Sequence, residues 1–178
     1  MQDISAGLAQ PSAEWSAGGH GGAAVASPYR RVQPNCNDQQ FVAALNAFRA
    51  SGGLAPAEEL LVSFNRRGGH GLATLARWIV ARQVVSFVWQ ARTWLPLFQW
   101  TPDDMTPRRD LAPVLATLNV ALGDWEAVQW FATPNAWLAG CTPVSMVQAD
   151  LPAVLLAARA VVPLWEQRED RQGREELA

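Results

Sequence analysis

The stretch 125–160 constrains the fold most, because several helix boundaries follow one another closely within it. Trp125, Val128 and Phe131 recur at the spacing of one apolar helix stripe. The residue before Pro134 is pushed out of the α region by the proline ring. The sequence therefore predicts a helix that ends just before Pro134.

The residues after this helix predict further boundaries. Asn135 is suited to cap a short helical turn through Trp137 and Leu138, and Gly140 suits the left-handed position that closes such a turn. We expect Trp137, on a short surface turn, to anchor a partner, because tryptophans at interfaces often carry much of the binding energy.

Two more helix starts come next. Thr142 and Pro143 are a cap and a first-turn proline, and Asp150 is suited to cap the helix after that. The result is three short helices. Helices this short are marginal alone in water, so they must dock on each other or on a partner.

Composition limits the class of protein. The 178 residues are 49% hydrophobic with a formal net charge of -2, enough for one sizeable core or two small ones. Cys36 and Cys141 are too few for a disulfide framework. Residues 1–22 lack the basic and apolar regions of a secretory signal, and no apolar run has transmembrane length. We therefore expect a cytoplasmic protein without membrane contact.

Composition also divides the chain into four parts. Residues 1–35 are rich in Gly, Ala, Ser and Pro and predict a disordered leader. Residues 36–109 predict helices and a β-hairpin, and 110–165 a helical module. Residues 166–178 are a charged tail. The predicted fold class is mainly α, a small helical bundle with one β-hairpin.

The first helix of the 36–109 region is predicted to begin at an Asp38 cap. Phe41, Leu45 and Phe48 recur at spacings of four and three, which indicates one buried face. The glycine pair at 52–53 is expected to end it.

Two more helices and a hairpin are predicted to follow. One helix starts at Pro56 and ends at the glycine pair 68–69, and the next covers about Leu72–Arg82. Val84–Trp89 and Trp94–Trp100 are β-branched and aromatic runs joined by a short polar link, which is typical of a hairpin.

Charge is distributed unevenly. Residues 66–109 carry seven arginines against two aspartates, a balance of +5, whereas residues 110–165 have a balance of -3. Three helices followed by a hairpin are also the element order of a winged helix-turn-helix, whose third helix enters the major groove. The residues expected to face DNA are then Arg66, Arg67, Thr74, Arg77, Arg82 and Arg92. Ordinary solvated charges are the alternative interpretation of these side chains.

No catalytic constellation is prominent. His20 and His70 lie fifty residues apart without metal-ligand spacing, so no metal site is predicted. An enzyme hypothesis makes Cys141 a nucleophile and His70 its base, but no third orienting group is suggested. Walker A and GxGxxG motifs are absent, so no nucleotide cofactor is expected. The sequence predicts a non-enzyme without cofactors.

One part of the chain resembles a known family. Residues 84–160 are similar to the toxin-binding domain of Xre/MbcA/ParS-type antitoxins, and Pro96-Leu97-Phe98-Gln99-Trp100 is similar to the P-x-FQF-like strand upstream of that domain. The positions that match its W…PN..L.G..P pattern are Trp130, Pro134, Asn135, Leu138, Gly140 and Pro143. The chain departs from the family at Cys141, Ser145 and Met146-Val147, where arginine, aspartate and a leucine pair are frequent.

The resemblance implies a binding function. It predicts a homodimeric antitoxin that neutralises a RES-type toxin, an enzyme that consumes NAD, and that also binds DNA to regulate itself. The motif residues together with Trp137 and Thr142 would form the partner site, with Trp137 and the exposed parts of Asn135 and Thr142 touching the toxin. A DNA-binding regulator or architectural protein without a toxin is the alternative.

Overall fold

The computed structural model of the protein describes residues 36–162. This part contains seven α-helices and one three-stranded antiparallel sheet, so the prediction of a mainly α fold with a hairpin is confirmed. The predicted leader at 1–35 and the charged tail at 166–178 lie outside the described residues. Within 36–162, no helix combines the length and the apolar character needed to cross a bilayer.

The first helix, α1 (Asp38–Phe48), begins one residue away from the predicted cap. Asn37, not Asp38, is the cap: its side chain accepts a hydrogen bond from the Gln40 backbone N–H at 2.9 Å. The Gln40 side chain accepts in return from the Asn37 N–H at 3.0 Å, which completes a capping box. The predicted end is confirmed, because a 3-10 turn, η1 (Arg49–Ser51), leads to a left-handed Gly52.

The buried face of α1 differs by one residue from the prediction. Phe41, Ala44 and Phe48 are buried, whereas Leu45 is 37% exposed. Phe41 stacks on the ring of Trp89 at a centroid distance of 3.7 Å. This contact fixes the rotation of the helix, so that Leu45 turns toward solvent.

The sheet contains one strand that the sequence did not predict. Its strands are β1 (Leu54–Pro56), β2 (Phe87–Trp89) and β3 (Arg92–Pro96), in the order β1-β3-β2. The predicted strands at 84–89 and 94–100 are therefore both too long, and residues 97–99 form a 3-10 turn, η2. β1 is an edge strand, which tolerates its terminal Pro56 because proline cannot donate to a ladder.

The hairpin turn consists of Gln90 and Ala91. Both have positive φ, at 47° and 59°. Two successive left-handed residues are the signature of a type I′ turn, whose twist matches that of the flanking strands. The link is therefore two residues long.

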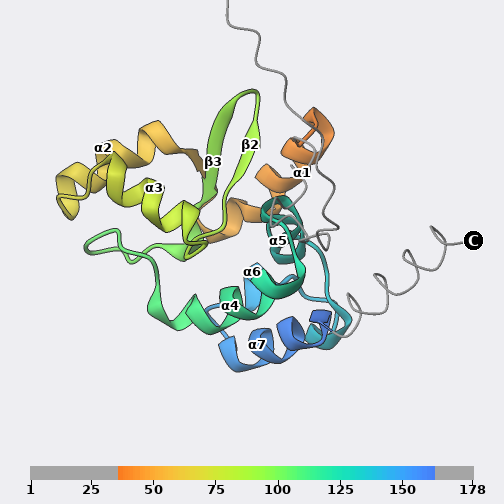
Figure 1. Ribbon diagram of the computed structural model, residues 1–178. Helices are drawn as coiled ribbons and strands as arrows, with labels where there is room; N and C mark the ends of the chain where they lie inside the picture. Colours follow the sequence, from red (N-terminus) through yellow and green to blue (C-terminus); the bar gives the residue numbers. More distant parts are fainter. Residues whose placement is uncertain (1–35, 163–178) are drawn as a thin grey trace, which may run out of the picture. The chain divides into compact units, whose positions relative to one another are not determined.

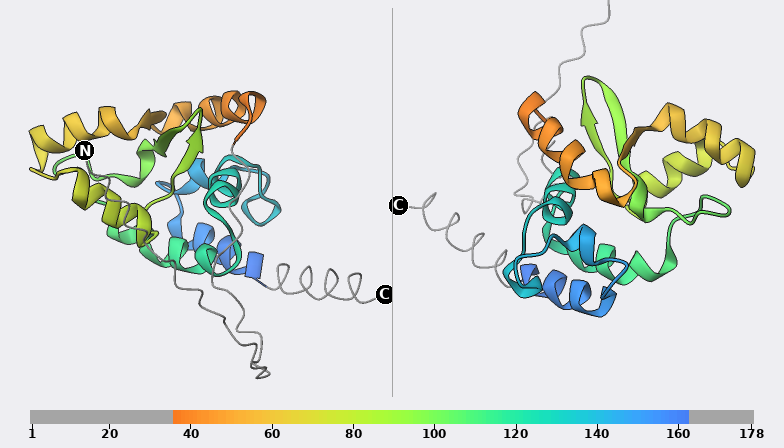
Figure 2. Two further views of the ribbon diagram at one scale, coloured as in Figure 1. Left: turned by 45° about the horizontal axis from the view of Figure 1, so that its top comes forward. Right: turned by 180° about the vertical axis from the view of Figure 1, so that it is seen from behind.

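The sheet lies between the first helix and the next two. α2 (Ala57–Arg67) and α3 (Leu72–Val80) pack on the face that carries Leu95, while α1 packs on the opposite face, at Trp94. Figure 1 shows the β2–β3 hairpin between α1 and the pair α2–α3, and the view from behind in Figure 2 agrees. The chain thus has the expected winged-helix element order with an added strand, but its three helices do not share one side of the sheet.

The C-terminal module is entirely helical within the described residues. Its elements are η3 (Arg109–Leu111), α4 (Ala112–Ala121), α5 (Asp124–Ala132), η4 (Ala136–Leu138), α6 (Pro143–Met146) and α7 (Leu151–Arg159). The expected C-terminal end of α5 and the expected starts of α6 and α7 are confirmed, and the Asp150 carboxylate accepts from the Ala153 N–H at 3.0 Å. α4 was not predicted; it lies side by side with α7 (Figures 1 and 2).

Two hydrophobic clusters form the core. The larger one, which we call the main core, joins α1, the hairpin and α4–α7 around Phe48, Leu118 and Phe131. The smaller one, the α2–α3 core, is built around Phe64 and Leu95 on the other face of the sheet.

Hydrogen bonds from the Gln99 side chain link η2, after the hairpin, to the backbone of Val85, before the hairpin. The side chain is 1% exposed; its oxygen accepts from the Val85 N–H at 2.7 Å, and its nitrogen donates to the Val85 carbonyl at 2.9 Å. The same nitrogen donates to the Pro96 carbonyl at 3.0 Å. The Gln99 amide thus bonds the Val85 backbone as a neighbouring strand would. This gives the glutamine of the PLFQW segment a structural role.

Candidate protein-binding site

The segment Asn135–Cys141, which we call the Trp137 loop, is closed by hydrogen bonds to Asn135. The Asn135 side-chain oxygen accepts from the Trp137 N–H at 2.9 Å, as the predicted cap requires. Its carbonyl accepts from the N–H groups of Leu138 and Gly140, and its own N–H donates to the Cys141 carbonyl, each at 3.0 Å. One residue therefore holds both ends of the loop together.

Two left-handed residues complete the loop. Ala139 and Gly140 have φ values of 53° and 82°, so the position predicted for Gly140 is shared with the alanine before it. The turn brings the Cys141 N–H to the Leu138 carbonyl at 3.0 Å. A side chain at Gly140 is disfavoured by the backbone conformation alone.

The Trp137 side chain projects from this closed loop into solvent. It is 71% exposed, the most exposed aromatic residue in the described part of the chain. Among the described residues, no aromatic ring packs on it, whereas the neighbouring Leu138 is buried in the main core. The loop thus has a fixed backbone and an unpaired indole, an arrangement that lowers the entropy lost when a partner binds.

The other motif residues divide into buried and surface positions. Pro143 and Leu138 are buried, and Trp130 is half-buried with its ring at 5.0 Å from that of Phe131. Pro134 and Gly140 are exposed, and Asn135 and Thr142 are half-buried. The buried residues pack in the core of the module, while the exposed and half-buried ones lie within five residues of Trp137 in the sequence.

The surroundings of Trp137 in the sequence are uncharged. Residues 127–149 contain no Asp, Glu, Lys, Arg or His, although eleven of them are exposed. Interface centres are depleted of charged residues and enriched in tryptophan. The exposed residues of this run have the composition of an interface centre.

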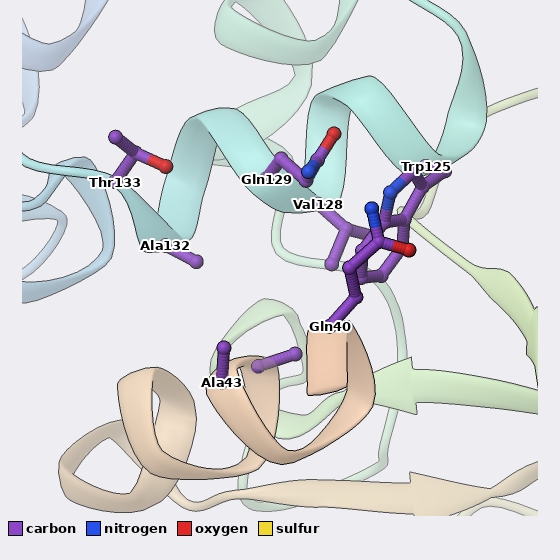
Figure 3. Close-up of a pocket in the computed structure, with 8 residues that line it drawn as sticks. Gln40, Ala43, Trp125, Val128, Gln129, Ala132 and Thr133 are labelled. Atoms are coloured by element: carbon purple, nitrogen blue, oxygen red, sulfur yellow. The ribbon is translucent and has the colours of Figure 1, made fainter. Parts of the chain in front are cut away.

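A groove with a volume of about 140 Å³ lies between α1 and α5. Its lining extends to Thr133, the residue before Pro134. Figure 3 shows Gln40 and Ala43 of α1 facing α5 across it. The α5 side is formed by Trp125, Val128, Gln129, Ala132 and Thr133. Every lining side chain is uncharged. The sequence did not predict this site, because its two walls are more than eighty residues apart in the chain.

The six residues predicted to face DNA do not form one surface of free side chains. Arg66 and Arg77 are exposed, and Thr74 is half-buried. Arg67 donates to the Pro102 carbonyl at 3.0 Å. Arg92 lies 3.5 Å from the Glu58 carboxylate, and its guanidinium sits 5.7 Å from the centre of the Trp94 ring.

Glu58 is ionised more readily than an ordinary glutamate. A hydrogen bond from its own backbone N–H, in the first turn of α2, is the main cause of its lowered pKa, and Arg92 adds to the effect. The pair is solvent-exposed, so it contributes little to stability.

Arg82 is committed to the fold, which corrects the prediction that it faces DNA. Its guanidinium donates to the carbonyls of Asn119 and Leu122 at 3.1 and 2.9 Å and forms an ion pair with Asp124 at 3.0 Å. The Asn119 amide donates to the Arg82 carbonyl at 3.0 Å. Arg82 therefore ties the end of α3 to the end of α4 and the start of α5.

The exposed face of α3 is mostly apolar. Leu72 is 65% exposed and Val80 is 83% exposed, with Ala73 and Ala76 between them, and Arg77 is the only charged residue of this helix. Such a face is poor in the polar groups that read base edges.

The residues of the enzyme hypothesis have separate surroundings. The His70 ring packs against Trp78 of α3 at a centroid distance of 5.2 Å, whereas Cys141 is exposed at the end of the Trp137 loop. Cys36 is buried, and burial raises the pKa of its thiol. Within residues 36–162, no three metal-ligating side chains form a cluster.

Asp104 has a structural role in the loop that follows β3. Its carboxylate accepts hydrogen bonds from the hydroxyls of Thr101 and Thr106 and from the Thr106 N–H. The bond from Thr101 is the main cause of its lowered pKa.

No protein-family model, no curated protein and no solved structure matches this chain.

Proposed function

We propose that this protein is a non-catalytic binding protein that holds a protein partner through the Trp137 loop. The observation that carries the proposal is a tryptophan 71% exposed on a loop whose backbone is closed on itself. Exposing an indole to water is unfavourable, and placing it in an apolar pocket contributes about 2 kcal/mol or more at an interface hot spot. The uncharged residues 127–149 support the same role.

The motif resemblance suggests the partner. Trp130, Asn135 and Gly140 are among the positions shared with the toxin-binding domain of Xre/MbcA/ParS-type antitoxins, and we propose a RES-type toxin as the partner. In this proposal the protein covers the entrance to the toxin's active site and thereby prevents the consumption of NAD. A homodimer and autoregulatory DNA binding belong to the same proposal.

The test uses the tagged protein isolated from its native host, together with Trp137→Ala and Val120→Ala. Val120 is a matched control because it is also 71% exposed, on α4. We expect one stoichiometric protein to co-purify with the wild type and with Val120→Ala but not with Trp137→Ala. The co-purified protein, once separated, should consume NAD, and adding back wild type should stop the consumption.

Other results would point elsewhere. Equal recovery with wild type and Trp137→Ala would contradict the anchor role of Trp137. Recovery of nucleic acid alone, with duplex binding that weakens steeply with salt and is reduced in Arg77→Ala, would support the DNA-binding alternative instead.

A further inference from the structure

The helix α1 carries two large apolar side chains that the fold leaves in solvent. Val42 is 54% exposed and Leu45 is 37% exposed, while Phe41, Ala44 and Phe48 face the core. Figures 1 and 2 show α1 at the rim of the described part of the chain. The outer side of this helix is therefore accessible to another molecule.

Four exposed residues of α1 and of the turn after it recur at spacings of four, three and four. They are Asp38, Val42, Leu45 and Arg49, which we call the α1 stripe. Positions at this spacing lie on one side of a helix and form the seam of a two-helix coiled coil. Arg49 belongs to η1, but its backbone angles are helical, with φ −51° and ψ −47°, so the stripe continues through it.

The α1 stripe is complementary to itself when two copies of the helix run antiparallel. A two-fold axis midway between Val42 and Leu45 brings Val42 of one copy opposite Leu45 of the other. The charged residues lie four positions outside this pair on either side, so the same axis brings Asp38 opposite Arg49 of the other copy. The contact then has an apolar centre and an ion pair at each end, repeated by the two-fold symmetry.

The charges also select the direction of pairing. Asp38 and Arg49 are the only charged residues between positions 38 and 49. Parallel helices in register would place Asp38 against Asp38 and Arg49 against Arg49, and like charges in contact are unfavourable. Charge complementarity therefore favours the antiparallel arrangement alone.

Both ends of the stripe are able to form these ion pairs. Among the described residues, the Arg49 guanidinium has no hydrogen bond and no ion pair. Asp38 uses its Oδ1 atom to accept from the Trp89 ring N–H at 3.0 Å. A carboxylate has about four acceptor sites, so Asp38 can accept from a guanidinium at the same time.

The length of the helix limits the strength of such a contact. Residues 38–49 form about 18 Å of helix, which is too short to bury the roughly 800 Å² per partner of a standard interface. Smaller interfaces belong to the weak and transient class. Monomer and dimer should therefore coexist at about 0.1 mM protein.

We propose that the α1 stripe is a self-association site through which two copies of this chain form an antiparallel α1–α1 dimer. Val42 and Leu45 of the two copies form its apolar centre, and Asp38 and Arg49 close both ends. The homodimer that the motif resemblance implies concerns residues 84–160. The α1 pairing uses a different part of the chain and goes beyond the proposed function, because it requires neither the Trp137 loop nor a toxin.

Sedimentation equilibrium of the full-length protein tests the pairing. Between about 10 and 500 µM, the average mass of wild type should rise from one chain toward two. Val42→Asp should remain monomeric, because it places an unpaired charge in the apolar centre. Val62→Asp on α2 is the matched control, since Val62 is 52% exposed, and it should dimerise as wild type does. Far-UV circular dichroism checks that each variant is folded.

A charge exchange tests the two ends of the stripe. Arg49→Asp and Asp38→Arg should each self-associate more weakly by about tenfold or more, because like charges then meet at both ends. An equimolar mixture of the two variants should recover the dimer, since each carries the charges that the other lacks. A mixture that associates no better than either variant alone would overturn the pairing.

Other outcomes separate this proposal from that of the Trp137 loop. Trp137→Ala should dimerise as wild type does, whether or not it loses a partner. A wild-type mass that stays at one chain throughout, or a folded Val42→Asp that dimerises fully, would overturn the α1 dimer and leave the loop proposal intact. If Trp137→Ala abolished the dimer, self-association would run through the loop and not through α1.

Discussion

The segment 96–100 and the Trp137 loop contain similar residues, but the aromatic side chains are buried in the first and exposed in the second. Each contains aromatic residues and one amide side chain that organises backbone. Gln99 uses its amide to bond the distant Val85 backbone, and the flanking rings Phe98 and Trp100 are buried. Asn135 uses its side chain within its own loop, and the aromatic residue there is left in solvent. The Asn135 amide bonds only within its own loop, and the neighbouring Trp137 side chain stays exposed. The Gln99 amide bonds a distant segment, and the neighbouring rings are held in the core.

The largest effect on stability is expected for Gln99→Leu. The substitution keeps the volume but leaves the buried N–H and carbonyl of Val85 without partners, which should lower the free energy of unfolding by about 2–4 kcal/mol. Urea denaturation followed by tryptophan fluorescence measures it. Gln148→Leu, at an exposed position, is the control. A loss of less than about 1 kcal/mol would show that water satisfies Val85 and that Gln99 is not the link described.

Arg82→Ala should come next, because it removes charged hydrogen bonds to the last carbonyls of α4. A loss of about 1–3 kcal/mol is expected, with Arg82→Lys recovering only part of it, since an ammonium lacks the guanidinium fork. The matched control is Arg77→Ala, which removes an exposed arginine from α3, the helix just before Arg82. Equal stability of the two alanine variants would contradict the tie between α3 and the C-terminal module.

Asn135→Ala tests the loop half of the comparison. Loss of this cap should cost about 1 kcal/mol, and Asn135→Asp should retain most of the stability because a carboxylate also caps. Hydrogen exchange of the Trp137 and Gly140 amides should accelerate more than that of the main core. Uniform acceleration everywhere would mean that the loop is not a separate unit.

A smaller, pH-dependent effect is expected at Asp110. Hydrogen bonds from Arg108 are the main reason for the lowered pKa of this carboxyl. Because the folded pKa lies below the unfolded value of about 3.9, the contribution is complete above that pH and is lost as the pH falls through the folded pKa. The pair is partly exposed, so Asp110→Asn should cost less than about 1 kcal/mol at pH 7. The difference between variant and wild type should shrink as the pH falls below the unfolded pKa, and a difference that stays constant with falling pH would argue against the pair.

The smallest effect on stability is expected for Trp137→Ala. Its side chain makes no aromatic contact within the described residues, so the free energy of unfolding should change by no more than about 0.5 kcal/mol. Thermal denaturation is sufficient to check this. A large loss of stability would mean that the indole packs on the protein itself, and the comparison with segment 96–100 would collapse.

Local signals in the sequence were enough for the C-terminal boundaries. Pro134, Asn135, Pro143 and Asp150 each act within a few residues, through backbone restriction or capping, and the structure places all four as predicted. α4 was missed because its apolar residues are spread around the helix and it contains no charged residue, so it shows no stripe.

The features set by distant contacts were not accessible from the sequence. β1 has only three residues and exists because Leu54–Pro56 finds β3 forty residues away. The rotation of α1 depends on the stacking of Phe41 on Trp89, and the commitment of Arg82 depends on carbonyls near residue 120. For the site, the prominence of Trp137 was predictable, whereas the α1–α5 groove depends on tertiary packing.

The Arg82 tie has a consequence for how the molecule opens. The α2–α3 core and the main core lie on opposite faces of one small sheet, and two such cores joined only by a sheet can open independently. A guanidinium shared between the end of α3 and the α4–α5 junction makes separate opening more costly. Slowly exchanging amides in the two cores should therefore report one common opening free energy.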